Sequence, residues 1–323
     1  MDKLDHQVKK LFERHQFGKV ALLTDSTHIK SSEEILSILQ KQKIDTHLII
    51  VPSDIKALID VSIWQNFSRV FINLPYSHVL SSGYIQGLLD LLSLDYTGSG
   101  MVASALANNR LTIKKIWQVN GISTTNFLRW RPNINWQEIA GLFGFPMAVK
   151  SIYSYNHTIF KVMNIEQLQE ATENFCNVYD ILFEPWVTGD RYVVYIVGDK
   201  VLLPVCIDEV LKDNPDQEDS YNAECYVNRM QKLAMDAFVA IGGQGLAKVN
   251  IIMDVNKDCW VSSIDPCPLI MTNNSFSKAA DNSSISFESI LKHILMTSFI
   301  KKCNHTKLNF FSDFNKYFNT DGL

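Results

Sequence analysis

The sequence has no long apolar run and no excess of positive charge. No stretch approaches the roughly 20 consecutive apolar residues that a membrane-spanning helix needs, and the charged opening MDKLDHQVKK argues against a secretory signal. The 34 Asp and Glu residues outnumber the 30 Lys and Arg residues, which gives a net charge of −4. This balance offers no basic surface to nucleic acid or to an anionic membrane, so we expect neither as a partner.

Paired cysteines are also missing. The six cysteines are scattered and form no Cys-x-x-Cys pair, which argues against a disulfide framework or a zinc ribbon and favours reduced thiols in a cytoplasm. The hydrophobic content of 46% is typical of a globular protein. A chain of 323 residues is long enough for two or three packed subdomains.

Apolar runs alternate with amphipathic segments in the first hundred residues. Short strands are expected at residues 19–23, 46–51 and 69–73, and helices at 33–42 and 84–94. Alternation of strand, helix and strand predicts a parallel sheet with crossover helices, which is an α/β fold.

Beyond residue 110 the pattern changes to strand pairs joined by short turns and separated by helices. Strand patterns occupy residues 145–153, 158–163, 180–186, 191–207, 245–254 and 259–265. Helical patterns occupy residues 110–120, 165–175, 228–240 and 287–301. The polar and acidic segment 210–224 is typical of a loop.

Both ends of the chain carry apolar side chains at helical spacing. Residues 3–16 place Leu4, Val8, Leu11 and Phe12 on one helical face, which predicts a helix that docks on the body or on a partner. The tail after residue 303 is rich in aromatic residues, and we expect it to pack as a short helix. These residues are Phe310, Phe311, Phe314, Tyr317 and Phe318.

Five segments, in order along the chain, resemble the D-alanine–D-alanine ligase family of the ATP-grasp superfamily. They are IQGLLDLLSLDYTGSGMVASAL (85–106), GFPMAVK (144–150), ILFEPWVTGDRYVVYIVGDKVLLPV (181–205), GLAKVNIIMD (245–254) and SSIDPCP (262–268). The resemblance implies an N-terminal parallel α/β subdomain followed by a two-subdomain ATP-grasp fold of α+β type.

The resemblance also implies a division of the chain. We expect an N-terminal helical extension at 1–17, an α/β domain at 18–108, a central ATP-grasp subdomain at 109–184, a C-terminal ATP-grasp subdomain at 185–302 and a C-terminal extension at 303–323. The family commonly forms homodimers through its first domain, so the resemblance implies a homodimer.

An enzyme of this family makes an acyl phosphate from ATP and a carboxylate, which an amine then attacks. On the nucleotide side, the resemblance places Lys150 and Lys114 on the phosphates, with Arg110 in place of a further lysine. It makes Glu184 the acceptor for the adenine amino group and Trp186 the hinge aromatic. The residues alone leave another interpretation open, in which both lysines are solvated and Glu184 merely ends a strand.

The family's metal ligands are altered in this sequence. An Asp, a Glu and an Asn become Asn250, Ser263 and Asp265, so the resemblance implies at most one Mg²⁺, held by Asp265 and Asn250. Lys248 replaces an arginine that steadies the transferring phosphate, and it is the candidate catalytic residue. A loop carboxylate before Pro266 with no metal role is the other interpretation of Asp265.

The segments that contact phosphate and substrate in the family are altered as well. SYNHTIF (154–160) replaces a glycine-rich lid, and the loop 24–32 has no acid at a clearly matching place for the D-alanine ammonium. Pro75 replaces a histidine, Leu269 replaces a glycine of the oxyanion hole, and Arg191 replaces an acid that binds the ribose. We therefore expect D-alanine binding to be impaired.

Three functional hypotheses follow. The leading one is a degenerate homologue with weak or lost ligase activity and residual ATP binding. The second is a working D-alanine–D-alanine ligase, or a related carboxylate–amine ligase, in peptidoglycan precursor synthesis. The third is a non-catalytic scaffold that uses its terminal extensions as contact surfaces.

Overall fold

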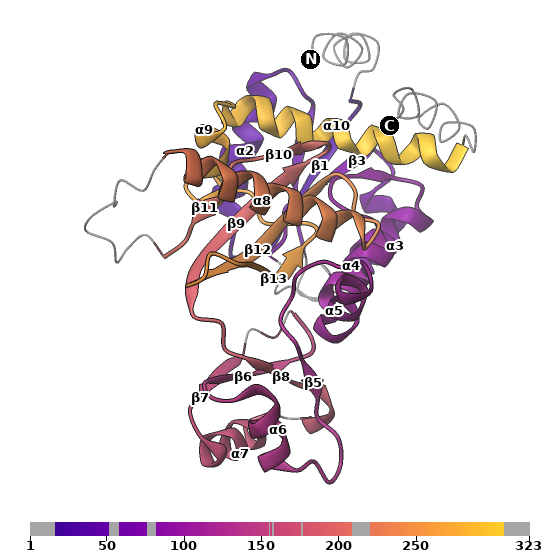
Figure 1. The fold of residues 1–323 in the computed structure, drawn as a ribbon. Helices are drawn as coiled ribbons and strands as arrows, with labels where there is room; N and C mark the ends of the chain where they lie inside the picture. Colours follow the sequence, from indigo (N-terminus) through magenta and orange to yellow (C-terminus); the bar gives the residue numbers. More distant parts are fainter. Residues whose placement is uncertain are drawn as a thin grey trace.

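The computed structural model describes residues 17–306 except for 52–57, 76–81, 155, 157, 176 and 209–219. The predictions for residues 3–16, for the tail from residue 307 and for most of the acidic loop lie outside the described residues. Two lobes are visible in Figure 1: a large body built on two sheets and a smaller lobe below it built on a third.

The first sheet is parallel, as the alternating pattern predicted. Its strand order is β2-β1-β3-β4, and every neighbouring pair runs in the same direction. The elements are β1 (Val20–Thr24), α2 (Ile29–Lys41), β2 (Thr46–Ile50), β3 (Arg69–Ile72), α3 (Tyr84–Leu91) and β4 (Asp95–Tyr96), with a 3-10 turn at Val61–Ile63. All residues of β1 and β3 are buried, which explains why residues 20–23 and 70–72 are continuously apolar in sequence.

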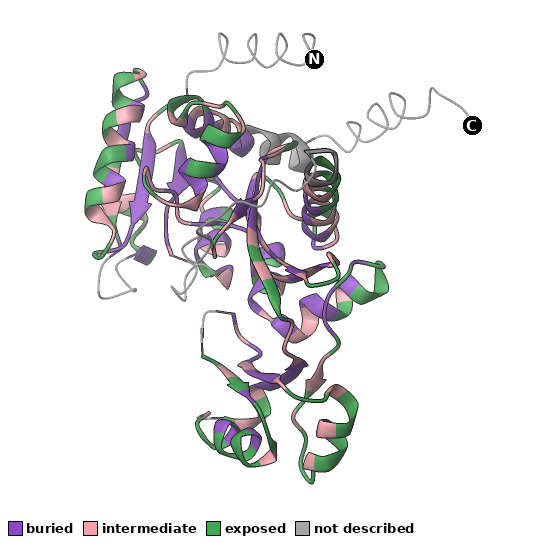
Figure 2. Cartoon of the chain, turned by 60° about the vertical axis from the view of Figure 1, so that its left-hand side comes forward, coloured by how far each residue is buried: buried purple, intermediate pink, exposed green. Residues whose placement is uncertain are grey.

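The small lobe is an antiparallel sheet with two helices on one face. Its strand order is β5-β8-β6-β7, and it has a core of its own (Figure 2). The elements are β5 (Leu128–Arg129), α6 (Trp136–Phe143), β6 (Met147–Ser151), β7 (Ile159–Val162), α7 (Ile165–Glu173), a 3-10 turn at Val178–Asp180 and β8 (Ile181–Pro185). The side chains of Asn135 and Asn164 cap the two helices by accepting bonds from first-turn amides.

The second sheet of the body is antiparallel, in the order β10-β9-β12-β13, with β11 paired to β9. Its elements are β9 (Gly189–Val197), β10 (Lys200–Val201), β11 (Val205–Cys206), α8 (Ser220–Val239), β12 (Leu246–Asp254), β13 (Cys259–Asp265), α9 (Ser275–Asn282) and α10 (Phe287–Thr306). The two sheets of the body share one core, which joins Leu22 of β1 to Tyr195 of β9 and Leu291 of α10.

The start of helix α8 was predicted wrongly. Helix α8 begins at Ser220, so residues 220–224 are helical rather than part of the acidic loop. The apolar face that holds the helix on its sheet lies further along, at Met230, Ala234 and Ala237. Packing of that face stabilises a helix whose first turns have a loop-like composition, because tertiary contacts override weak local propensities.

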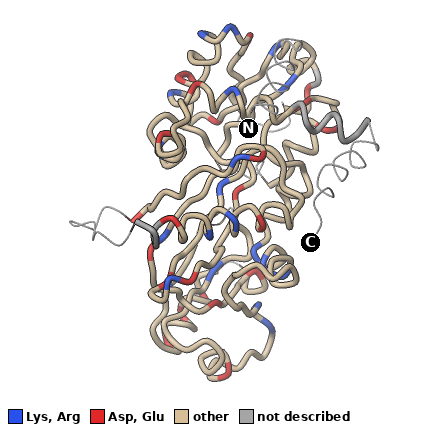
Figure 3. The backbone as a smooth tube through the Cα atoms, turned by 45° about the horizontal axis from the view of Figure 1, so that its top comes forward, with Lys and Arg blue, Asp and Glu red and all other residues tan. Residues whose placement is uncertain are grey.

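Two short helices connect the lobes. They are α4 (Met101–Asn108) and α5 (Arg110–Val119), and Trp117 of α5 is fully buried and donates to the carbonyl of Ala237 at 3.1 Å. Acidic and basic residues are interspersed along the described chain (Figure 3). Among the residues that the structure describes, no helix has the length and hydropathy needed to cross a bilayer.

Candidate functional site

Two lysines and a glutamate meet where α5 lies against the small lobe. Ala148 of β6 pairs with Glu184 of β8, so both side chains lie on one face of the sheet. Lys150 is two residues further along β6 and therefore lies on the same face. Lys150 Nζ donates to Glu184 Oε2 at 2.9 Å, and Lys114 Nζ lies 3.4 Å from the same oxygen. The structure therefore brings together three residues that the resemblance assigns to the nucleotide.

Lys114 is buried rather than solvated, which removes one of the interpretations left open by the sequence. Its side chain is 1% exposed, and Nζ donates to Thr124 Oγ1 at 2.9 Å, to Thr125 Oγ1 at 2.6 Å and to the Thr125 carbonyl at 3.2 Å. Burial lowers the pKa of Lys114 to about 8, although Glu184 opposes the shift. The ammonium thus holds the loop after α5 against the carboxylate.

Glu184 has one satisfied and one unsatisfied oxygen. Oε2 accepts from Lys150 and, at 2.8 Å, from Thr125 Oγ1. Oε1 is buried and has no hydrogen-bond partner in the described structure. Burial raises the pKa of this carboxyl, but the ammonium groups of Lys150 and Lys114 outweigh burial and hold it at about 2. A charged acceptor without a partner is suited to an N–H donor.

Arg110 binds the base of the segment that replaces the glycine-rich lid. Its Nη1 donates to three backbone carbonyls, and the Ser154 amide donates to the Asn108 carbonyl at 2.8 Å. The carbonyl acceptors of Arg110 belong to Ser151, Tyr153 and Asn156. These bonds tie the start of the segment to the junction between α4 and α5.

Trp186 and Arg191 lie along the connection from β8 to β9. The Trp186 amide donates to the Pro146 carbonyl at 3.0 Å, and Lys161 Nζ lies 5.1 Å from the centroid of the indole ring. Arg191 Nε donates to both carboxylate oxygens of Asp208, at 2.9 and 3.1 Å. Arg191 is therefore held by the carboxylate of Asp208.

The residues that the resemblance assigns to the metal lie together on the antiparallel pair β12–β13. Asn250 pairs with Ser263 and Lys248 pairs with Asp265 across the ladder. Asn250 Nδ2 donates to Ser263 Oγ at 2.8 Å, and Asp265 Oδ1 accepts from the Cys267 amide at 3.0 Å. Burial raises the pKa of Asp265 to about 7, with Lys248 opposing the shift.

This donor set does not fit two divalent cations. Asp265 supplies the one carboxylate of this set. The other two members are the Asn250 amide and the Ser263 hydroxyl, which are hydrogen-bonded to each other. Within the part of the chain that the structure describes, no three His, Cys, Asp or Glu side chains gather as metal ligands. Because Mg²⁺ prefers anionic oxygen, these residues fit at most one ion, with the remaining ligands supplied by phosphate and water.

The loop after α5 joins the two groups of residues. Thr124 Oγ1, which accepts from Lys114, donates to the Val261 carbonyl of β13 at 2.8 Å. The amide of Val261 donates in turn to the Ser123 carbonyl at 2.9 Å. The lysine–glutamate cluster is thus connected by hydrogen bonds to the strand that carries Ser263 and Asp265.

Replacing Asp265 with asparagine is expected to stabilise the protein at pH 8 and to have little effect near pH 4. The folded pKa of about 7 lies above the ordinary aspartate value of 3.8, so the free energy of unfolding falls as the pH rises between these values. Asparagine keeps an acceptor for the Cys267 amide and carries no charge. The expected gain is about 1–3 kcal/mol at pH 8, measured by urea unfolding at both pH values. An equal change in stability at both pH values would contradict a buried charge on Asp265.

Sequence reasoning missed two polar residues at the ends of the parallel strands. Asp25 Oδ1 accepts from the amides of Thr27 and His28, both at 2.9 Å, and from their side chains. Asn73 is fully buried and clamps Ile270, receiving its amide at 2.8 Å and donating to its carbonyl at 3.2 Å. Both follow directly after a buried strand, and that position was the available signal. The loop that follows β1 is therefore held by hydrogen bonds to the carboxylate of Asp25.

The chain is similar to D-alanine–D-alanine ligases in sequence and in structure. The family model described as the D-Ala D-Ala ligase C-terminus matches residues 116–296. The ligase of Nitrosococcus oceani is 30% identical, with 87% of this chain and 94% of the relative covered, and that of Hydrogenovibrio crunogenus is 29% identical, with 92% and 99% covered.

Solved structures show the same fold. The ligase of Bacillus anthracis complexed with ATP has a TM-score of 0.74 at 20% identity, and the alignment covers 89% of this chain and 99% of that one. The ligase of Coxiella burnetii has a TM-score of 0.73 at 18% identity, with 90% and 98% covered. These matches agree with the parallel first sheet and the two antiparallel sheets that follow it.

Proposed function

We propose, from the premise that the chain belongs to the D-alanine–D-alanine ligase family, that it keeps a nucleotide site while its ligation activity is weak or lost. The observation that carries the proposal is the hydrogen bond between Asn250 and Ser263. Asn250 and Ser263 stand at the positions where the family has two of its metal-binding acids. An amide and a hydroxyl cannot replace the charge that binds a second cation.

ATP is the proposed ligand of the Lys150–Glu184 cluster. Glu184 Oε1 accepts from the adenine amino group, and the ring lies beside Trp186 at the hinge. Lys150 serves the phosphates, and its partial exposure of 14% leaves its ammonium accessible. Lys114 and Arg110 contribute positive charge but no direct hydrogen bond to the phosphates, because their N–H groups already donate to backbone or threonine oxygens.

The proposed transfer machinery is reduced to Lys248 and one Mg²⁺ held by Asp265 and Asn250. Lys248 keeps the charge of the arginine that it replaces but loses the two-pronged geometry that grips a transferring phosphate. Leu269 stands in place of an oxyanion-hole glycine, and loss of a single oxyanion donor typically costs about 10²–10³ in rate. Several such losses together leave little ligation.

Calorimetric titration with ATP, with and without Mg²⁺, tests the proposal. We expect micromolar binding that changes less than about tenfold when Mg²⁺ is added, which corresponds to less than about 1.4 kcal/mol. Phosphate release that depends on D-alanine should stay at background. Robust D-alanine-dependent release would instead establish a working ligase, as the alternative of peptidoglycan precursor synthesis requires. The extent of the match to curated ligases favours that alternative.

Lys150→Ala is expected to weaken ATP binding at least tenfold, because it removes the one accessible ammonium of the cluster. The expected loss of about 1.5–3 kcal/mol is that of a charge-assisted hydrogen bond. Lys115→Ala, which truncates an exposed lysine of α5, is the matched control and should bind as the unaltered protein does. Equal affinities for the two variants would remove Lys150 from the site, and absence of binding in the unaltered protein would favour the scaffold hypothesis.

The remaining expectations are also part of the proposal. Self-association through the first domain is tested by sedimentation velocity, and the five segment boundaries are tested by limited proteolysis. A cytoplasmic location agrees with the reduced state of Cys225 and Cys259 in the described structure.

A further inference from the structure

The hydroxyl of Thr125 lies between the two oppositely charged groups of the lysine–glutamate cluster. Lys114 Nζ donates to Thr125 Oγ1 at 2.6 Å, and Thr125 Oγ1 donates to Glu184 Oε2 at 2.8 Å. All three side chains are buried. The hydroxyl is therefore shielded from water and has an ammonium on one side and a carboxylate on the other.

The chemistry of these partners fixes the direction of both hydrogen bonds. An ammonium only donates and an ionised carboxylate only accepts, whereas a hydroxyl accepts and also donates its one proton. Because Thr125 Oγ1 accepts from Lys114, its proton points at Glu184 Oε2. Lys150 Nζ donates to the same oxygen at 2.9 Å. In the described structure Oε2 thus receives two hydrogen bonds, while the buried Oε1 receives none.

Thr125 is the more rigid of these two donors. Lys150 is partly exposed and reaches Glu184 through a long, flexible stem. The side chain of Thr125 is short and β-branched, which restricts its first torsion angle, and its hydroxyl is bonded at both ends. The bond from Thr125 therefore determines which oxygen of Glu184 is left without a partner.

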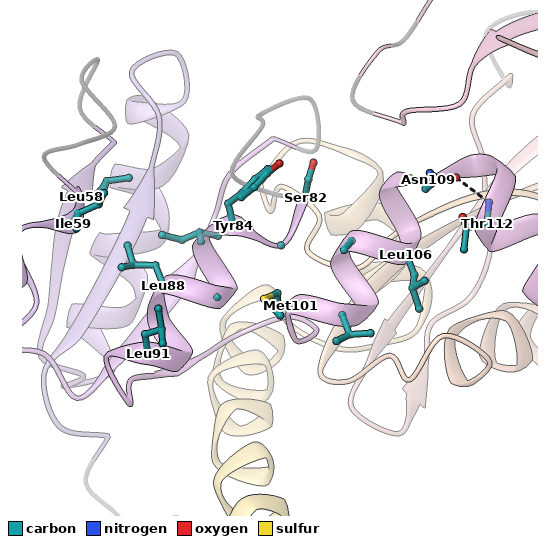
Figure 4. Close-up of a pocket in the computed structure, with 15 residues that line it drawn as sticks. Leu58, Ile59, Ser82, Tyr84, Leu88, Leu91, Met101, Leu106, Asn109 and Thr112 are labelled. Carbon is teal, nitrogen blue, oxygen red and sulfur yellow. Dashed lines mark hydrogen bonds between the residues drawn. The ribbon is translucent and has the colours of Figure 1, made fainter. Parts of the chain in front are cut away.

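The loop that carries this hydroxyl is anchored on two sides. Thr124 Oγ1 accepts from Lys114 and donates to the Val261 carbonyl at 2.8 Å, which attaches the loop to β13. Lys114 is carried by α5, and Asn109 caps the first turn of that helix by accepting from the Thr112 amide at 2.9 Å. Figure 4 shows this cap as a dashed line at one end of an apolar pocket along α3 and α4. Neither anchor belongs to the sheet of the small lobe.

We propose that Thr125 is a positioning residue for base recognition: its hydroxyl holds the carboxylate of Glu184 so that Oε1 faces the base of the bound nucleotide. The inference rests on the proposed binding of ATP at this cluster and adds the residue that sets base selectivity. An unpartnered carboxylate oxygen favours the amino group of adenine, which donates. It disfavours the carbonyl that inosine triphosphate (ITP) carries in place of that amino group, because two acceptors then face each other.

Replacement of Thr125 with serine, cysteine and valine tests the proposal, with the Kd values for ATP and ITP measured calorimetrically on the full chain. The series weakens the donor stepwise, because a thiol donates weakly and valine does not donate. The unaltered chain and Thr125→Ser should bind ATP about tenfold or more tightly than ITP. Thr125→Val should bind ATP about tenfold more weakly and ITP nearly as before, with Thr125→Cys between the two.

Thr124→Val is the matched control for the valine variant. It removes an equivalent hydroxyl from Lys114 but leaves the donor to Glu184 in place. Its affinities for ATP and ITP should fall by the same factor, so that their ratio stays that of the unaltered chain. An equal loss of selectivity in Thr124→Val and Thr125→Val would overturn the proposal, because the ammonium and not the carboxylate would then set the base preference. A serine variant with the low selectivity of the valine variant would also overturn it.

The same titrations separate this inference from the proposed function. Absence of ATP and ITP binding in the unaltered chain would refute both. ATP binding that stays selective over ITP in Thr125→Val would overturn the role of Thr125 alone. If the valine variant does not fold, the comparison of serine with cysteine decides, because these side chains are similar in size and differ in donor strength. Equal selectivity in those two variants would then overturn the proposal.

Discussion

Glu184→Ala is expected to lower the free energy of unfolding by about 3–5 kcal/mol, the range observed when one partner of a buried ion pair is removed. The carboxylate is 2% exposed and is the acidic partner of both Lys150 and Lys114. Without it, the ammonium of Lys114 stays buried beside a second ammonium. Thr124 and Thr125 then provide neutral oxygens but no charge.

Urea unfolding at pH 7 measures this effect. Glu173→Ala, which truncates an exposed glutamate of α7 in the same lobe, is the matched control and should change stability by less than about 0.5 kcal/mol. Equal losses in the two variants would show that the cluster adds nothing to stability.

The pH dependence distinguishes charge from packing. The folded pKa of Glu184, about 2, lies below the ordinary glutamate value of 4.5, so its ionic contribution is present above pH 4.5 and is lost as the pH falls towards 2. The difference between the unaltered protein and Glu184→Gln should therefore shrink over this interval. A stability difference between the two proteins that does not change with pH would mean that Glu184 acts through packing and not through its charge.

The fold was predictable because its signals are local and repeated. Buried strands such as β1 and β3 read as short apolar runs, and the helices between them show a 3.6-residue period, so a parallel sheet was the consistent solution. The start of α8 was not predictable, because residues 220–224 are helical through packing that begins further along the helix.

The candidate site was predictable in membership but less so in geometry. Strand alternation across β6 and β8 places Lys150 near Glu184, which the sequence positions alone suggest. The burial of Lys114 depends on Thr124 and Thr125, whose loop position is set by a bond to another subdomain. The bonds of Arg110 to backbone carbonyls leave no pattern in the sequence, because every residue has a carbonyl.

Restoring the two lost acids is the second prediction with a large effect. Asn250→Asp/Ser263→Glu replaces the hydrogen-bonded amide and hydroxyl with two carboxylates next to Asp265. Without Mg²⁺ these like charges repel one another in a half-buried position, and the melting temperature should fall by about 5 °C or more, which corresponds to a loss of a few kcal/mol. Millimolar Mg²⁺ should recover the loss, because an ion that binds the folded state alone stabilises it by mass action.

ATP affinity is the second readout of this variant. With three acids present, Mg²⁺ should tighten ATP binding at least tenfold, about 1.4 kcal/mol, whereas the unaltered protein changes less. Asn256→Asp adds one of the same charges in the exposed turn between β12 and β13 and should show neither effect. Metal-dependent stability without tighter ATP binding would mean that the acids form a cation site that the nucleotide phosphates do not reach. Neither effect would mean that the β12–β13 residues are not the metal site, and the argument for lost ligation would then rest on the altered lid and oxyanion hole.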